Sequence, residues 1–379
     1  MELPTHTDIT EGAPRKGIPA FRLIEDQLNQ VRQLINEQLI VPAKAAEINR
    51  LLEYIKTRSG KMIRPALVLL SYHAVHDASA FAGASLPLRG TPPCGNPKQG
   101  CEKNTQYTIH NTQYEATCVA AIVEMIHNAT LLHDDVIDEG QKRRGLPTIN
   151  SLWGNESAVL LGDFLLSQVF KMCTDLEPKI TNIIAAAATR TCEGELRQVI
   201  QRHNWQTSAS SVEPLSESEY IDIITEKSAA FFSSCCHLGA LLAQAAETEV
   251  ESLARFGLNA GIAFQITDDL LDLIGDESQT GKTVGSDVNK NKLTLAIIHL
   301  LTVVDQKEKS KLYNKLNRSV GTSRKALLKM LKSYNSLEYA YSRAREFVDK
   351  AMQALTGLKQ SQAKEALIET AKFMANRVI

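Results

Sequence analysis

The chain of 379 residues is long enough to form one large domain or two medium ones and to bury an extensive core. Its composition, 44% apolar but only 6% aromatic, favours packed helices over a β-sandwich or a β-barrel. The formal net charge of −1 argues against a general affinity for nucleic acid or for an anionic membrane surface, so the charges that matter are local.

The seven cysteines indicate a reduced, intracellular protein, because their number is odd and they are scattered along the chain. Cys94 and Cys101 are too far apart in sequence for the usual paired zinc spacing. Cys235 and Cys236 lie in a segment of small residues, where burial as small hydrophobic side chains is expected. No disulfide framework and no zinc site is predicted.

The first residues of the chain do not resemble a targeting signal. Residues 1–17 carry acidic side chains early and lack an apolar core segment, so they are expected to be a disordered tail. No run reaches the roughly 18 apolar residues that span a bilayer, and a cytoplasmic location without a transmembrane segment is predicted. Residues 18–379 are expected to form a single domain.

Apolar residues at helical spacing predict a first helix over Phe21–Leu39 and a second over about Ala43–Thr57. The next segment, GKMIRPALVLLSYHAV, places Pro65 in the first turn of a third helix, directly after Lys61 and Arg64. Two cations at a helix N-terminus oppose the helix dipole, and a bound anion would relieve that conflict. This segment alone supports an anion site and a pair of solvent-exposed cations equally.

The composition changes between Asp77 and Tyr114. The stretch GASLPLRGTPPCGNPKQGCEKNTQ is rich in Gly, Pro and polar residues and has no apolar periodicity. We interpret residues 77–114 as a surface-loop insertion and not as a domain boundary, because a helical pattern resumes directly afterwards.

The stretch Val123–Thr148, VEMIHNATLLHDDVIDEGQKRRGLPT, turns from apolar to acidic at Asp134, Asp135 and Asp138. On a helix, Asp134 and Asp138 lie about 40° apart around the axis and share a face, with Asp135 about 100° from Asp134. Carboxylates clustered in this way suit Mg²⁺, which binds through a few carboxylates and substrate phosphates. A single DDxxD pattern is nevertheless more often a solvated helix end than a metal site.

A second copy of the pattern changes that balance. Gln265–Asp272 reads QITDDLLD, with Asp268, Asp269 and Asp272 at the end of the apolar helical run Leu258–Thr267. Each copy is followed by Lys or Arg. If the two motifs faced each other across a helical bundle, they would hold several divalent ions, and a diphosphate could bridge them.

Further helices are predicted over three segments between the motifs: Ser157–Phe170, Ile180–Ile200 and Tyr220–Leu242. Residues 204–216 are predicted to form a polar, Ser-rich loop. Lys227 lies among small and apolar neighbours, where it either extends its charge to solvent or faces a polar cavity. Leu295–Ile379 is helical without a chemical signature, and the fold class is therefore all-α.

The two DDxxD motifs, the GKxxRP segment and the RRG after the first motif together resemble the trans-isoprenyl diphosphate synthases, which make farnesyl, geranylgeranyl and longer polyprenyl diphosphates. The likeness runs from about Ser59 to Ile298 and extends over most of the chain outside the tail and the loop. The resemblance implies a single-domain helical bundle of the isoprenoid synthase type around a deep central cavity. It also implies a homodimer, while a heteromer with a second subunit stays open.

The resemblance assigns roles to matching residues. About three Mg²⁺ ions per active site, with substrate bound, would be held by Asp134, Asp135, Asp138, Asp268, Asp269 and Asp272. The allylic diphosphate would also contact Arg143, Lys227, Ser228, Gln265 and Lys282. The isopentenyl diphosphate would be bound by Lys61, Arg64, His127 and Arg144.

Two positions depart from the family pattern: Met62 stands where the family often has Arg, and Ser228 stands where it often has Thr. Neither departure removes a metal ligand, and Ser228 keeps the hydroxyl. A lone His on an apolar helix is more often a core residue than a ligand. His127, however, lies two helical turns before Asp134 on a similar face, which favours the diphosphate contact.

The implied reaction depends on charge stabilisation. Cleavage of the carbon–oxygen bond in an allylic diphosphate leaves positive charge on carbon and negative charge on diphosphate, which Mg²⁺ and the cations named above would stabilise. The double bond of isopentenyl diphosphate attacks the carbocation, and loss of a proton to the released diphosphate completes a five-carbon extension. No side-chain nucleophile is required.

Product length is expected to depend on the helix before the first motif. Thr130 and Ala129, at the fourth and fifth positions before Asp134, are small where relatives with short products have bulky aromatic residues. Ile126 is the next residue that could close the bottom of the tunnel for the product tail. Because a helical turn rises about 5.4 Å, roughly one isoprene unit, an open turn here predicts a product of about C30 to C50, as used for quinone side chains.

Three other interpretations are less consistent with the motifs. A terpene cyclase shares the first motif but normally replaces the second and lacks the GKxxRP pocket. A non-catalytic partner subunit of a heteromeric synthase typically loses aspartates from one motif, whereas both are complete here. A helical protein that binds only divalent ions would gain nothing from the cations Lys61, Arg64 and Arg144.

Overall fold

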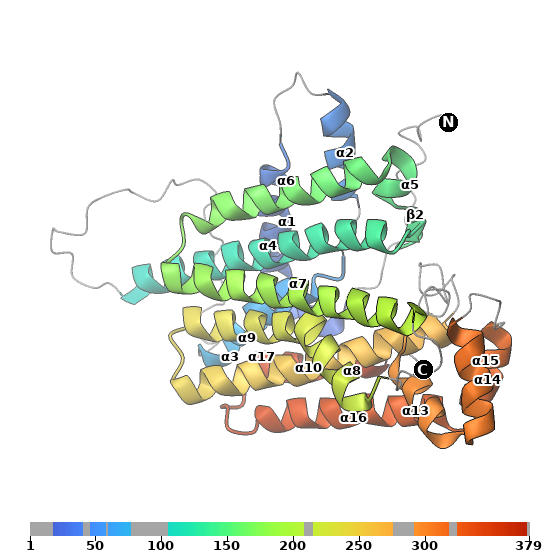
Figure 1. Ribbon diagram of the computed structural model, residues 1–379. Coiled ribbons are helices and arrows are strands. Elements are labelled where there is room, and N and C mark those ends of the chain that lie inside the picture. Colours follow the sequence, from blue (N-terminus) through green and yellow to red (C-terminus); the bar gives the residue numbers. More distant parts are fainter. Residues whose placement is uncertain are drawn as a thin grey trace.

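A computed structural model describes residues 18–40, 46–57, 60–76, 105–207, 215–275, 292–317 and 324–376. The described part is helical apart from one short hairpin, which confirms the all-α prediction (Figure 1). The predicted tail, residues 1–17, lies outside the described residues.

The first elements are a 3₁₀-helical turn and three helices: η1 (Pro19–Ile24), α1 (Glu25–Gln38), α2 (Ala46–Lys56) and α3 (Ile63–Val75). The central part comprises α4 (Thr105–Ile137), the hairpin β1 (Lys142–Arg143) and β2 (Leu146–Pro147), α5 (Ile149–Trp153), α6 (Asn155–Cys173), α7 (Pro178–Thr207), α8 (Glu217–Ile224), the π-helical turn η3 (Thr225–Ala229), α9 (Ala230–Leu242) and α10 (Glu247–Ile274). The last helices are α13 (Leu295–Val303), α14 (Gln306–Asn317), α15 (Arg324–Ser333), α16 (Ser336–Ala354) and α17 (Gln362–Ala375).

The long helices run roughly alongside one another in two groups (Figure 1). One group holds α4 and α6, the other holds α9, α10 and α16, and α7 packs against α9 and η3. Helix α3 packs between them against α4 and α9. The two aspartate motifs lie near the C-terminal ends of α4 and α10, so each group contributes one motif.

Helix α3 is buried because its sequence, IRPALVLLSYHAV, is apolar around its whole circumference. Pro65 occupies its first turn, as predicted. Helix α9 approaches α3 at Gly239, where a Cβ atom would lie only 2.2 Å from the carbonyl oxygen of Val68. The close approach therefore requires glycine at this position.

The predicted surface loop is wrong at its C-terminal end. Helix α4 begins at Thr105, so the part of the 77–114 segment from 105 onward is helical, whereas residues 77–104 lie outside the described part. Polar composition misled the prediction, because polar side chains here are satisfied by tertiary contacts. The Tyr72 and Thr112 hydroxyls are 2.8 Å apart, and Gln113 is buried.

Within α4, the segment Thr112–Ile137 is long and apolar enough to cross a membrane by length and composition, contrary to the expectation that no such run exists. In this structure 67% of its most apolar window is buried inside the protein. The core helix of a folded domain passes the same test, so the segment is weak evidence for a membrane span.

Candidate active site

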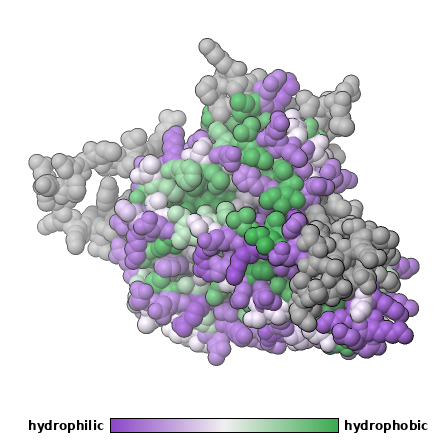
Figure 2. All heavy atoms as spheres, viewed as in Figure 1, coloured by the Kyte–Doolittle hydropathy of each residue, from purple (hydrophilic) through white to green (hydrophobic). Residues whose placement is uncertain are grey.

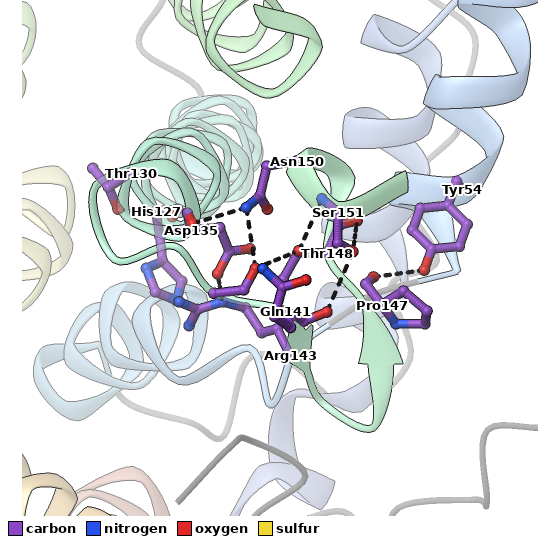
Figure 3. A network of polar contacts seen from close by, with 11 residues as sticks. Tyr54, His127, Thr130, Asp135, Gln141, Arg143, Pro147, Thr148, Asn150 and Ser151 are labelled. Carbon is purple, nitrogen blue, oxygen red and sulfur yellow. Dashed lines mark hydrogen bonds and ion pairs between the residues drawn. The ribbon is translucent and has the colours of Figure 1, made fainter. Parts of the chain in front are cut away.

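The first motif lies on the last turns of α4 and at the residue beyond them. Asp134 and Asp138 are partly exposed, whereas Asp135, which lies between them in sequence, is only 3% exposed. The Asp135 carboxylate accepts a hydrogen bond from Arg143 Nε at 2.7 Å (Figure 3). The motif thus presents two accessible carboxylates and uses the third to hold an arginine.

The arginine comes from a two-residue hairpin. Arg143 pairs with Leu146, and the turn between them, Arg144-Gly145, has φ values of 58° and 83°. Two positive φ values identify a type I′ turn, which suits Gly145 but strains a residue with a side chain. Arg144, one of the predicted isopentenyl diphosphate ligands, therefore sits in the strained position at the tip.

Arg144 lies against the loop before α3. A Cβ atom on Gly60 would be 2.6 Å from Arg144 Nη2, so the guanidinium packs directly against this glycine. Lys61 follows directly and is exposed, with its Nζ 4.9 Å from the ring centroid of Phe373. The buried Met62 next to it has φ 56°. The structure thereby brings together Arg144 and the GKxxRP segment, which are far apart in sequence.

The second motif repeats the division seen in the first. Asp268 and Asp272 are partly exposed, and Asp269 is 3% exposed. Asp269 accepts hydrogen bonds from Tyr220 Oη at 2.7 Å and from Gln265 Nε2 at 3.0 Å. It also forms an ion pair of 3.1 Å with the ammonium group of Lys292, located before α13.

Lys227 faces polar partners, which decides between the two predicted environments. It lies in the π-helical turn η3, which interrupts the single helix predicted over Tyr220–Leu242. Its ammonium group pairs with Glu195 and donates to Gln198 Oε1 at 2.8 Å. Helix α7 approaches this turn through Gly194, where a Cβ atom would lie 2.2 Å from Lys227 N. Such π-helical turns occur frequently at functional sites.

Ser228 connects the π-helical turn to the second motif. Its hydroxyl donates to Gln265 Oε1 at 2.7 Å, and the amide of Gln265 donates in turn to Asp269. Three of the predicted site residues therefore form one hydrogen-bonded chain. Lys282, predicted to join them, lies outside the described residues.

Arg64 relates the two motifs electrostatically. Its guanidinium carbon lies 4.8 Å from the ring centroid of Phe232. Burial lowers the pKa of Arg64, while the charges of Glu124, Asp268 and Asp134 oppose that effect. Helix α7 gives the geometric link between the motifs: Arg202 Nη1 lies 3.9 Å from Asp138 Oδ1, and Glu195 pairs with Lys227. Ser228, next to Lys227, bonds to Gln265 on α10.

The donor set fits Mg²⁺. Within the described ranges, no three His, Cys, Asp or Glu side chains converge as a preformed metal site. The accessible carboxylates instead come from two helices, an arrangement that suits ions completed by substrate phosphate oxygens. Burial raises the pKa of Asp134 to about 6, with Lys227 opposing this effect and Glu195 adding to it. A divalent cation would remove this destabilisation of the ionised carboxylate.

The residues predicted to control product length lie on α4 before the first motif. Ala129 and Ile126 are buried, whereas Thr130 and His127 are partly exposed. The Thr130 hydroxyl donates to the His127 carbonyl oxygen at 2.8 Å. Thr130 is thus the most accessible of the three length-determining candidates.

Sequence reasoning did not identify several residues that contact the site. They are Tyr220, Glu195, Gln198, Arg202, whose Nη1 lies 3.9 Å from Asp138 Oδ1, and Asn150, which contacts the backbone of the first motif. Their partners lie elsewhere in the chain, and nothing in their local sequence indicates the contact.

Comparison with known proteins gives consistent results. The profile of the polyprenyl synthetase family matches residues 45–333. The chain is 33% identical over 334 residues to octaprenyl diphosphate synthase of Escherichia coli K12, covering 87% of this chain and 90% of that protein. It is 33% identical over 273 residues to heptaprenyl diphosphate synthase component 2 of Geobacillus stearothermophilus, covering 72% of this chain and 81% of that protein. A crystal structure of polyprenyl synthase from Caulobacter crescentus CB15, complexed with calcium and isoprenyl diphosphate, superposes with a TM-score of 0.79 at 28% identity. The superposition covers 97% of this chain and 100% of that one.

Proposed function

The chain belongs to the polyprenyl synthetase family, and we propose that its active site is the space between the two aspartate motifs. The protein is a prenyltransferase of the long-chain polyprenyl diphosphate synthase type. The observation that carries the site assignment is a series of contacts through α7, which meets the first motif through Arg202 and Asp138 and pairs with Lys227 through Glu195. Ser228, next to Lys227, bonds to Gln265, which bonds to Asp269 of the second motif. A diphosphate between the motifs would meet carboxylate-bound cations on two sides.

The accessible aspartates of each motif, Asp134, Asp138, Asp268 and Asp272, are the proposed Mg²⁺ ligands. Mg²⁺ bound there supplies Lewis acidity, which stabilises charge on the departing diphosphate. The buried aspartates act differently in this proposal: Asp135 orients Arg143 and Asp269 orients Lys292 through the contacts described above. This division refines the expectation that all six aspartates bind metal.

The cations of the site divide between the two substrates. Arg143 and Lys227, each held by a carboxylate, bind and orient the allylic diphosphate, with Ser228 and Gln265 alongside. The second group, which binds isopentenyl diphosphate, comprises Lys61, Arg64, His127 and Arg144. Binding both diphosphates through fixed cations brings the double bond of one substrate to the carbocation of the other. Loss of a proton to the released diphosphate completes the step.

The product is proposed to reach about C30 to C50, because small residues one helical turn before the first motif leave room for several isoprene units. Thr130→Phe is expected to shorten it, since this partly exposed side chain lies four residues before Asp134. Ala129→Phe, in a fully buried position, should shorten the product too but with a loss of stability from overpacking. Chromatography of the dephosphorylated products measures the product length. An unchanged length with Thr130→Phe would show that this face of α4 does not line the cavity that holds the growing product. A quinone side chain is the proposed use.

A second copy of the chain is proposed to cover the outer face of α6 and α7. Figure 2 shows hydrophobic residues gathered over these helices. Phe170, Leu160, Leu196 and Ile200 are 70%, 67%, 61% and 56% exposed, and exposed apolar side chains that gather on one face mark an interaction surface. Light scattering of the purified chain is expected to give a dimer, and Leu196→Glu a monomer. A monomer in the wild type would favour a heteromer, as the name of the Geobacillus relative suggests for that protein.

Incubation with labelled isopentenyl diphosphate, farnesyl diphosphate and Mg²⁺ tests the function. A ladder of products ending near C30 to C50 is expected. Termination at C20 would keep the enzyme class and overturn the length proposal. No extension by the isolated chain, followed by extension after a partner is added, would favour the heteromer. The cytoplasmic location remains a prediction from the sequence, to be tested by cell fractionation.

A further inference from the structure

The helix that carries the first motif ends in a polar network (Figure 3). The side-chain amide of Asn150, on α5, donates hydrogen bonds from Nδ2 to the carbonyl oxygens of Asp135 and Gly140, both at 3.1 Å. Gly140 N donates to the Asp135 carbonyl oxygen at 2.8 Å. A single side chain thus joins the last turn of α4 to the loop that follows it.

Thr148 completes the connection from the other end of the loop. Its hydroxyl donates to the Gly140 carbonyl oxygen at 2.6 Å, and its backbone N donates to the Gln141 carbonyl oxygen at 3.0 Å. Thr148 is fully buried. Next to it, Tyr54 from α2 donates to the Pro147 carbonyl oxygen at 2.7 Å. The residues on both sides of the β1–β2 hairpin are therefore fixed to one another.

The chemistry of these contacts requires an amide at position 150. Both partners of Asn150 are carbonyl acceptors, and only the NH₂ group can serve them. The other amide atom, Oδ1, is buried and has no hydrogen-bond partner among the described residues. A buried acceptor without a donor is unfavourable, so the side chain is placed by what its NH₂ group donates. An aspartate of the same shape would set a carboxylate oxygen against two carbonyl oxygens.

We propose that Asn150 and Thr148 are positioning residues for diphosphate binding, because they fix the hairpin that carries Arg143 and Arg144. The inference rests on the proposed function for the substrate that Arg144 binds. Arg143 has its own ion pair with Asp135 and keeps its place without the hairpin ends. Arg144 lies at a positive φ of 58°, a conformation that persists only when its surroundings hold it. Loss of the contacts therefore affects the isopentenyl diphosphate site more than the allylic site.

Four variants test this inference. Asn150→Asp reverses the polarity of the amide, and Thr148→Val removes the hydroxyl at nearly constant shape. Thr148→Ser keeps the hydroxyl. Ser157→Ala is the matched control, since the Ser157 hydroxyl donates within the neighbouring helical turn, to Trp153 O at 2.8 Å. Asn150→Asp and Thr148→Val are expected to raise KM for isopentenyl diphosphate about tenfold, the effect of losing one good hydrogen bond. KM for the allylic substrate should change about twofold or less, and the other two variants should match the wild type.

A second measurement does not depend on turnover. The hairpin sequence Lys142-Arg143-Arg144 is a trypsin site, and its cleavage rate reports how firmly the hairpin is held. Asn150→Asp and Thr148→Val are expected to be cleaved here about tenfold faster, with unchanged rates elsewhere, and Thr148→Ser should restore protection. If the wild type fails to extend any primer but these cleavage rates hold, the proposed function fails and the positioning role stands. Equal rises in both KM values, or wild-type cleavage in Asn150→Asp, would overturn the inference.

Discussion

The two aspartate motifs have the same pattern of exposure but are held in place differently. In both, the outer aspartates are partly exposed and the middle one is 3% exposed. Asp135 is held by Arg143, eight residues along the chain. Asp269 is held by Gln265, one helical turn earlier on α10, and by two residues from distant parts of the chain, Tyr220 and Lys292. The first motif is thus organised by a local hairpin and the second by tertiary packing.

The helix ends that carry the motifs differ in the same way. The end of α4 is tied by the neutral amide of Asn150, fifteen residues beyond Asp135. The end of α10 is capped by Arg324 of α15, which donates to the carbonyl oxygens of Leu273 at 3.0 Å and Gly275 at 2.8 Å. A cation is favourable at a helix C-terminus. Substitutions should therefore act through a nearby loop in one motif and through distant helices in the other.

The largest expected effect is common to both motifs. Asp134→Ala and Asp268→Ala should each lower kcat by about a thousandfold, because each removes a proposed metal ligand that stabilises the departing diphosphate. Circular dichroism should show an unchanged fold for both, since neither side chain is fully buried. Turnover near the wild-type rate in either variant would refute the metal assignment for that motif.

Arg143→Ala should have the next largest effect, because it leaves the buried Asp135 carboxylate without its cation. Breaking such a buried ion pair costs about 3 kcal/mol of unfolding free energy, and KM for the allylic substrate should rise as well. Urea denaturation measures the first effect and steady-state kinetics the second. Lys56→Ala, which breaks the exposed Lys56–Glu53 pair, is the control and should change both quantities little. Equal effects of the two variants would contradict the role of Arg143.

Tyr220→Phe should be milder, since Asp269 keeps two of its three partners. Losing a hydrogen bond to a charged acceptor should lower the free energy of unfolding by about 2 kcal/mol. The efficiency kcat/KM for the allylic substrate should fall about tenfold, because Asp269, which Lys292 and Gln265 both contact, is held less firmly. Tyr334→Phe, which removes a hydroxyl bonded to Glu308 away from the site, should leave kinetics unchanged. A kinetic loss of equal size in both variants would indicate a general structural effect.

Arg324→Ala should have the smallest kinetic effect, because the capped carbonyl groups lie beyond the last aspartate of the motif. The free energy of unfolding should fall by about 1 kcal/mol, with KM values within about twofold of the wild type. Arg324→Lys keeps the charge and should recover part of the loss. If Arg324→Ala instead abolished turnover, the end of α10 would be far more sensitive than its contacts indicate.

The sequence predicted features that depend on local pattern. Apolar periodicity located most of the helices, and Pro65 marked the first turn of α3 as expected. The two motifs and their accompanying cations were sufficient to indicate the family. These features are visible because helical spacing and motif spacing are both local properties of the chain.

Features set by tertiary contacts were missed for a physical reason. The π-helical turn at Lys227 depends on the close approach of Gly194, 33 positions earlier, and no rule on local composition reports it. Composition predicts a loop over residues 105–114, where the structure has helix, because a polar residue such as Thr112 bonds across to α3. Asn150 resembles any polar residue beside a turn until its two carbonyl partners are known.

The most direct test of the central claim, that the two motifs share one diphosphate, is thermal unfolding with Mg²⁺ and inorganic pyrophosphate, added separately and together. A ligand that binds the folded state raises the melting temperature. In the wild type, the shift with both should exceed the sum of the two separate shifts. Asp134→Ala and Asp268→Ala should each abolish that excess, and the double variant should behave like either single one. Additive shifts in the wild type, or an excess that survives in one single variant, would contradict a shared site.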